Sequence, residues 1–320
     1  MEPHDPFPAT TWDGIGADGW DGCVGNDDLK LISASSVPKA CASPALERWG
    51  ITRTIEQLAV RLPEFENLIA TGGLDAAVRW ASELRYLPDE GAELNAADSG
   101  TLMHGLLEAW LKGENVPDTS NQQILSDPVL TGMATNLWNW YCKFQPEPVA
   151  MEQVVYSPEM GTAGRFDAIV QFRKAPELGV CLMDLKNTRS ARYKSGGLKK
   201  VFGDSHGLQL ATYRYSTHVA TFEPRLEMKS KASSTRTYLL NTAERAACKP
   251  MWHIDSTVIV ANNPEQCLLY PVDTGPAVLR RAVEAVGLHR WIAEESKNVV
   301  GPTVTPLIEL PRLVAQTEGS

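Results

Sequence analysis

Several features that would place this chain in a familiar class of protein are missing from its 320 residues. No apolar run approaches the roughly 20 residues that a membrane-spanning helix needs. The first residues are acidic and rich in glycine and proline, whereas a secretory signal peptide has a basic start and an apolar centre. The six cysteines contain no Cys-x-x-Cys pair, so neither a disulfide framework nor a zinc ribbon is indicated. We therefore expect a cytoplasmic protein without a membrane segment.

A surplus of basic residues is also missing, since 39 acidic residues outnumber 30 lysines and arginines and the formal net charge is -9. This balance argues against indiscriminate binding to nucleic acid. A polyanionic partner nevertheless responds to where the basic side chains cluster. One such cluster is KNTRSARYKSGGLKK (186–200), which holds six basic residues and no acid. The chain is therefore acidic on average but has one strongly basic segment.

The spacing of apolar residues divides the chain into four regions. Residues 1–32, rich in Asp and Gly, are expected to form a flexible acidic arm. Helical spacing predicts a helical N-terminal region over 33–97. Residues 98–297 are predicted to form the core, and the prolines of 298–320 indicate an extended tail.

Within the core, helical and strand-like segments alternate in groups. The expected helices are 99–113, 128–144, 206–222 and 276–296, and the expected strands are 149–157, 165–172, 180–187, 235–241 and 255–273, the last of them a hairpin. Helices followed by strands, a helix, more strands and a final helix favour a mixed α/β or α+β core with a helical N-terminal extension.

Charged side chains stand inside two of these predicted strands, RFDAIVQF and VCLMDLKN, which are joined by a segment of hairpin length. Side chains of a strand alternate between its faces, so Asp184 and Lys186 project to one side, and strand pairing can bring Asp167 alongside Asp184. Buried carboxylates that lie close together are costly. Either one of them takes up a proton or a divalent cation binds both, and oxygen ligands suit Mg²⁺ or Mn²⁺.

The order GRFD…DLK resembles the motif core of the PD-(D/E)XK nuclease superfamily, in which an acid on one strand is followed by (D/E)-x-K on the next. Flanking segments are similar to those of its RecB-like branch. GTLMH (Gly100–His104) resembles the G-x-x-x-H helix motif, and HGLQLATYRY resembles the Q-x-x-x-Y helix. Glu152 lies where members often carry an acid on the first core strand. The resemblance covers about residues 98–215. Within this branch, the chain resembles phage-type and CRISPR-associated RecB-like exonucleases and the mitochondrial genome-maintenance exonuclease.

The resemblance implies a restriction-endonuclease-like core, with a central mixed sheet flanked by helices, and a metal-dependent hydrolase acting on phosphodiester bonds of DNA ends. It implies one or two Mg²⁺ or Mn²⁺ ions. Carried onto this sequence, the metal ligands are His104, Asp167, Asp184 and the Leu185 carbonyl.

Further roles follow from the same resemblance. Lys186 would orient the hydrolytic water, and Glu152 would be another ligand or hold a metal-bound water. Gln209 and Tyr213 would position the metal shell or the DNA backbone, although their segment also fits an ordinary amphipathic helix. Several RecB-like nucleases hold an iron–sulfur cluster through one N-terminal cysteine and a tight C-terminal trio. Cys41 could be the first, but no trio follows, so we expect no cluster.

The basic cluster follows directly after the predicted ligands, which favours contact with DNA phosphates over a merely solvated loop. The DNA-binding residues expected there are Arg189, Arg192, Lys194, Lys199 and Lys200. The expected partner is DNA with single- or double-stranded ends, in recombination, repair or phage DNA metabolism, where a partner protein is also conceivable. Two alternatives stay open: an endonuclease of the same superfamily, and a non-catalytic DNA-binding protein that keeps the fold.

Overall fold

The computed structural model describes residues 29–40, 44–88, 92, 94–192, 205–228 and 236–291. In this part of the chain the predicted mixed α/β class is confirmed. The helices are α2 (Pro44–Val60), α3 (Leu62–Glu83), α4 (Ala96–Lys112), α5 (Asp118–Ser126), α6 (Pro128–Phe144), α7 (His206–Arg214), α8 (Thr242–Ala247) and α9 (Pro276–Arg290), with 3₁₀ turns η1 (Ala34–Ala40), η2 (Leu84–Tyr86) and η3 (Pro176–Leu178).

The strands are divided between two sheets, where a single central sheet was expected. One sheet has the order β12-β11-β6-β5-β2, with strands β2 (Pro146–Met151), β5 (Ala168–Phe172), β6 (Val180–Asn187), β11 (Ser256–Asn262) and β12 (Cys267–Pro271). The other has the order β10-β7-β3-β4-β1-β9-β8, with β1 (Leu29–Ser33), β3 (Val154–Ser157), β4 (Thr162–Arg165), β7 (His218–Val219), β8 (Arg225–Met228), β9 (Arg236–Leu240) and β10 (Lys249–Pro250).

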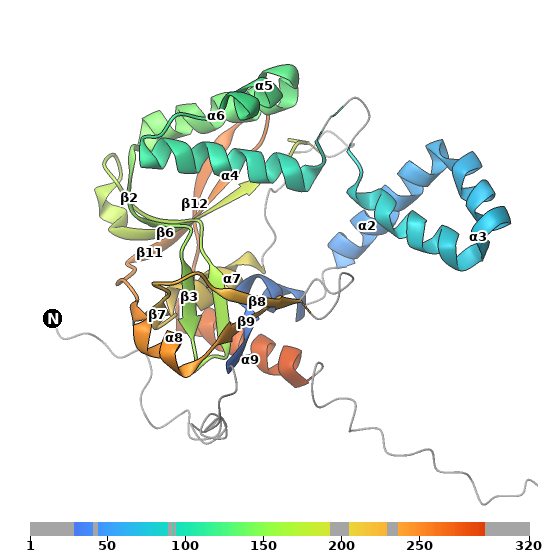
Figure 1. Cartoon of the computed structure of the whole chain (residues 1–320). Helices are drawn as coiled ribbons and strands as arrows, with labels where there is room; N and C mark the ends of the chain where they lie inside the picture. Colours follow the sequence, from blue (N-terminus) through green and yellow to red (C-terminus); the bar gives the residue numbers. More distant parts are fainter. Residues whose placement is uncertain are drawn as a thin grey trace, which may run out of the picture.

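The five-stranded sheet lies between two helical layers. Helices α4, α5 and α6 lie over one of its faces (Figure 1), where Met103 and Leu137 pack with Met183 of β6. The opposite face packs on α7, since Leu182 of β6 shares a buried cluster with Leu210 and Tyr213. Neighbouring residues of β6 therefore serve different cores, as alternation along a strand requires.

Both hairpins predicted from the sequence are present. Strands β5 and β6 pair antiparallel, with Ala168 opposite Met183, and the turn between them contains η3. Strands β11 and β12 also pair antiparallel, and β11 runs parallel to β6 with Ile259 opposite Asp184. Asp184 thus lies in an interior strand of the sheet, between β5 and β11.

An antiparallel two-stranded ribbon passes from one sheet into the other. β3 and β4 pair in the seven-stranded sheet, and their continuations β2 and β5 pair in the five-stranded sheet. The predicted strands 149–157 and 165–172 are each interrupted where the ribbon crosses. At this crossing the backbone N–H of Glu152 donates to the carbonyl of Asp167 at 3.0 Å, and Glu152 has a left-handed backbone with φ 49°. We call these two residues and their neighbours the junction.

The predicted arm over 1–32 ends too late. Residues 29–32 belong to β1, which lies inside the seven-stranded sheet between β4 and β9, and Leu31 is fully buried. Local sequence pattern does not predict a strand whose pairing partners are distant in the sequence, which explains the error. Residues 1–28 and the tail 298–320 lie outside the described residues.

The predicted helical N-terminal region is confirmed by α2 and α3, which project from the two sheets (Figure 1). The helix predicted over 206–222 is shorter than expected. It ends at Arg214, and His218–Val219 forms β7, which pairs with β3. Hydrogen bonding to β3 outweighs helical spacing there, because tertiary partners override local preference. Within the described residues, no helix combines the length and the apolar character that crossing a membrane requires.

Candidate metal centre

Helix α4 packs so that His104 lies near the end of β6 in the five-stranded sheet. The Asn95 side chain caps its start by accepting from the Asp98 N–H, and Gly113 ends it in a left-handed conformation with φ 68°. The predicted helix over 99–113 is thereby confirmed. Gly100 and His104 are four residues apart and so share one face of the helix, and both line the same cavity.

The structure brings together three of the predicted site residues. Among the described residues, His104, Glu152 and Asp167 each offer a ligand atom, and these atoms all lie within 4.8 Å of one another. His104 Nδ1 lies 3.3 Å from Asp167 Oδ2. All three side chains are half-buried. This group is close enough to bind a metal ion.

The location of the two acids follows from the junction. Glu152 and Asp167 occupy the two strands of the ribbon at the same level, where both leave regular strand geometry. The interruption frees their side chains from the in-and-out alternation of a sheet. Both therefore reach the middle of α4, where His104 lies.

Asp184 and Lys186 form a second group beside the first. Lys186 Nζ lies 2.6 Å from Asp184 Oδ2, and the Asp184 side chain is only 5 % exposed. The backbone N–H of Leu185, between them, donates to Asp167 Oδ2 at 2.7 Å and so links the two groups. Asp184 is not part of the group within 4.8 Å, so its sharing of an ion with His104 and Asp167 stays a prediction. Its carboxylate faces Lys186 instead.

The acids of the junction repel one another. Burial and the nearby Asp184 raise the pKa of Asp167, although His104 and Lys186 oppose the shift. Burial, Asp167 and Glu108 raise the pKa of Glu152 to about 7. Such shifts mean that the ionised forms are disfavoured in the folded protein. A positive ion would relieve them.

Lys186 keeps its proton. Burial alone would lower the pKa of its ammonium group, but the negative charges of Asp184 and Asp167 raise it above the usual value. A lysine in this state donates hydrogen bonds and positive charge, and it does not act as a base.

Gln209 and Tyr213 lie on the opposite side of the ribbon from α4. Gln209 Nε2 donates to the Tyr213 hydroxyl at 3.1 Å, and burial raises the pKa of that hydroxyl. The Tyr213 ring packs so closely on Gly164 that a Cβ there would lie 2.6 Å from the ring. Neither side chain lines the described cavity, so α7 supports the ribbon from behind.

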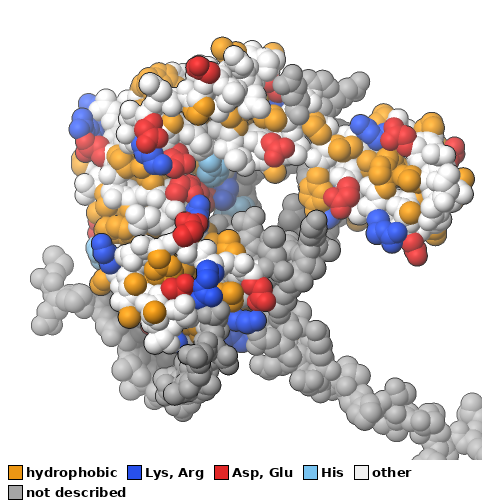
Figure 2. All heavy atoms as spheres, in the orientation of Figure 1, with side chains coloured by type: hydrophobic (Ala, Val, Ile, Leu, Met, Phe, Trp, Pro, Cys, Tyr) orange, Lys and Arg blue, Asp and Glu red, His pale blue; other side chains and the backbone are white. Residues whose placement is uncertain are grey.

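The cavity at the junction has a volume of about 470 Å³. Its lining includes backbone or side chains of Ala96, Ala97, Gly100, Thr101, His104, Glu152, Arg165, Asp167, Leu185, Lys186 and Asn187. Figure 2 shows acidic, basic and histidine side chains gathered around the hollow between the upper helical layer and the lower sheet. Nothing within 4 Å would meet a Cβ at Gly100, so this glycine leaves the floor of the cavity open.

Arg165 and Asn187 are among the lining residues to which sequence reasoning gave no role. Arg165 is half exposed, and its guanidinium has a loose ion pair with Glu223 at 3.9 Å. A signal existed, because Arg165 stands two positions before Asp167 in the motif GRFD. Asn187 follows Lys186 directly, and its amide accepts from Asn262 at 3.1 Å.

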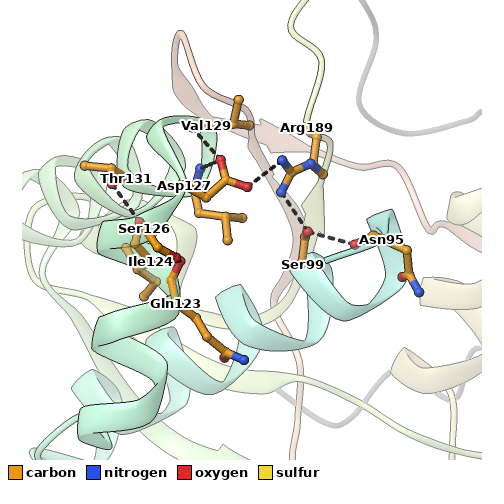
Figure 3. Close-up of polar contacts among 10 residues, drawn as sticks. Asn95, Ser99, Gln123, Ile124, Ser126, Asp127, Val129, Thr131 and Arg189 are labelled. Atoms are coloured by element: carbon orange, nitrogen blue, oxygen red, sulfur yellow. Dashed lines mark hydrogen bonds and ion pairs between the residues drawn. The ribbon is translucent and has the colours of Figure 1, made fainter. Parts of the chain in front are cut away.

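The predicted DNA-binding residues have different outcomes. Arg189 pairs with Asp127 at 2.6 Å (Figure 3), and its side chain is largely buried. Arg192 forms an exposed pair with Glu265 at 2.8 Å. Lys194, Lys199 and Lys200 lie outside the described residues, as does Cys41. Contact with DNA stays a prediction for this segment.

No protein-family model matches the chain, and no curated protein matches it. The resemblance to PD-(D/E)XK nucleases therefore stays a prediction, supported by short motifs and by the geometry of the junction.

Proposed function

We propose that this protein is a metal-dependent nuclease that hydrolyses phosphodiester bonds at DNA ends. The observation that carries the proposal is the convergence of His104, Glu152 and Asp167 within 4.8 Å, beside a protonated lysine on the neighbouring strand. A purely structural role gives no reason to place like charges together at a cavity.

The donor set fits a divalent cation. Two carboxylates with raised pKa values and one imidazole offer the oxygen and nitrogen ligands that Mg²⁺ or Mn²⁺ accepts. His104, Glu152 and Asp167 would hold the ion, and Asp184 with the Leu185 carbonyl would complete its surroundings. A bound ion would supply charge neutralisation at the phosphate and would lower the pKa of water.

The residues of this chain have separate tasks in the reaction. Lys186, held by Asp184, donates hydrogen bonds to the attacking water or to a phosphate oxygen. Arg165 at the cavity wall offers a second positive group for the phosphate backbone. Gln209 and Tyr213 keep the ribbon in place and thereby fix the two junction acids.

A digestion panel tests the proposal. End-labelled single- and double-stranded DNA, linear and circular, is incubated with Mg²⁺, Mn²⁺ or a chelator. We expect metal-dependent loss of linear DNA from its ends and no cutting of closed circles. Cutting of circles would establish the endonuclease alternative. Binding without cleavage of any DNA or RNA would establish the non-catalytic alternative and reject the proposed reaction.

A further inference from the structure

One polar network joins the end of β6 to the first turns of two helices (Figure 3). Arg189 lies two residues beyond β6 and donates from Nη2 to Asp127 Oδ2 at 2.6 Å and from Nη1 to Ser99 Oγ at 3.1 Å. The Arg189 and Asp127 side chains are 10 % and 12 % exposed, and Ser99 is 1 % exposed. The guanidinium of Arg189 is therefore buried and hydrogen-bonded to other residues of the protein.

Both partners of Arg189 are anchored in turn. Ser99 Oγ donates to the Asn95 carbonyl at 2.7 Å, within the first turn of α4. Asp127 caps α6 by accepting from the N–H groups of Val129 and Leu130. Although burial opposes it, the hydrogen bonds from Arg189 and from these N–H groups keep the pKa of Asp127 below its usual value. The network is thus a set of charge-assisted bonds between fixed elements.

The network connects the two elements whose separation sets the distance between His104 and the residues of β6. The first turns of α4 also carry Gly100 and lead to His104, whereas β6 carries Asp184 and Lys186. Arg189 joins the segment after β6 to the start of α4 through its bond to Ser99, and the nearby Asn187 and Gly100 both line the cavity. A planar guanidinium can hold two partners at once, which a lysine cannot do with the same geometry.

We propose that Arg189 is a positioning residue of the metal centre: it holds α4 against β6 and so fixes His104 relative to the acids of the ribbon. The inference rests on the proposed function for its effect on cleavage, and on the metal site alone for its effect on ion binding. It replaces the direct DNA contact expected from the sequence.

The test compares four variants in the full chain, with Mn²⁺ affinity measured by calorimetry and cleavage measured as kcat and KM for end-labelled DNA. Arg189→Gln should weaken Mn²⁺ binding and lower kcat by about 10- to 100-fold, the range typical of residues that orient metal ligands, while KM for DNA stays unchanged. Arg189→Lys should fall between this variant and the wild type. Ser99→Ala removes only the bond to α4 and should show the same two effects at smaller size.

The matched control is Arg281→Gln, which breaks an exposed ion pair with Glu284 on α9, a helix to which the article assigns no site residue. It should leave Mn²⁺ affinity and kcat at wild-type values. If Arg189→Gln does not fold, Ser99→Ala decides the matter, because it keeps the Arg189–Asp127 pair.

Other outcomes overturn the inference. A rise in KM with unchanged kcat and unchanged Mn²⁺ affinity would make Arg189 a phosphate contact. Wild-type values throughout in Arg189→Gln or in Ser99→Ala, or a wild type that binds no Mn²⁺, would also reject it. A wild type that binds Mn²⁺ but cuts no nucleic acid defeats only the proposed reaction, since the Mn²⁺ affinities still test the positioning role.

Discussion

Acidic side chains in two regions of this molecule differ in what surrounds them. At the junction, Glu152 and Asp167 lie beside each other, Asp184 lies near Asp167, and the pKa values of Glu152 and Asp167 are raised. At the helix ends and on the surface, Asp127 and Glu265 each face an arginine, and their pKa values are lowered. Carboxylates of the junction repel one another, whereas each carboxylate of the other region is stabilised by an arginine.

The difference separates acids that stabilise the fold from acids arranged for another purpose. A carboxylate with a lowered pKa favours the folded state above its pKa, whereas one with a raised pKa disfavours it. His104 and Lys186 offset the repulsion at the junction only in part, since the Asp167 pKa remains raised. Without a bound cation, the acids of the junction therefore lower the free energy of unfolding, and a bound cation would offset this loss.

The largest effect is expected from removing one charge of the junction. Asp167→Asn keeps an acceptor for the Leu185 N–H but loses the ligand charge. Cleavage of end-labelled DNA should fall at least about 100-fold, because several kcal/mol of stabilisation by the metal are lost and each ~1.4 kcal/mol is tenfold. The midpoint of thermal unfolding without metal should stay the same or rise. A large fall of both activity and stability would show that Asp167 serves the fold.

Addition of metal should make the junction acids stabilising. Binding of Mn²⁺ or Mg²⁺ to the folded state alone raises the free energy of unfolding by about 2.7 kcal/mol at a hundredfold excess over Kd. Thermal unfolding with and without the ion measures this rise. Asp167→Asn and His104→Ala should respond much less. An equal response in these variants would place the ion elsewhere.

The pH dependence of stability sharpens the comparison. The folded-state pKa of Glu152, about 7, lies above its ordinary 4.5, so the folded protein holds this proton more tightly than the unfolded chain. The contribution of Glu152 to the free energy of unfolding therefore falls as pH rises from about 4.5 to about 7, and the loss persists above.

Glu152→Gln lacks this loss. In the presence of a chelator, its advantage over the wild type should grow from near zero at low pH to about 1–2 kcal/mol above pH 7, a value reduced for partial exposure. Denaturant unfolding at several pH values measures it. Glu177→Gln, at an exposed position in η3, is the control and should show a constant difference. A flat profile for Glu152→Gln would remove the charge repulsion assigned to this residue.

The smallest effect belongs to the surface pairs. Glu265→Gln removes the carboxylate that faces Arg192, and exposed pairs contribute little because water and salt screen them. Neither cleavage nor the unfolding midpoint should change measurably. A clear loss of activity would mean that this pair orders the neighbouring basic segment for DNA.

Local pattern could predict the elements whose signals are local. The segment of hairpin length between β5 and β6 and the helical spacing of α4 and α6 predicted these elements, and Gly100, His104 and Asp167 line one cavity. The interruption of the ribbon could not be predicted, because the apolar runs continue across Glu152 and Asp167. The pair of Arg189 with Asp127 could not be predicted for a similar reason, since Asp127 lies 62 residues earlier and no short pattern connects the two.

The backbone of Glu152 has one more consequence. A positive φ of 49° is a conformation that glycine adopts without strain and that an L side chain adopts only at a cost. Glycine would be the cheaper occupant if this residue merely turned the chain from one sheet to the next. The turn alone therefore does not explain a glutamate at this position, whereas the proposed ion site, to which its carboxylate would contribute, does.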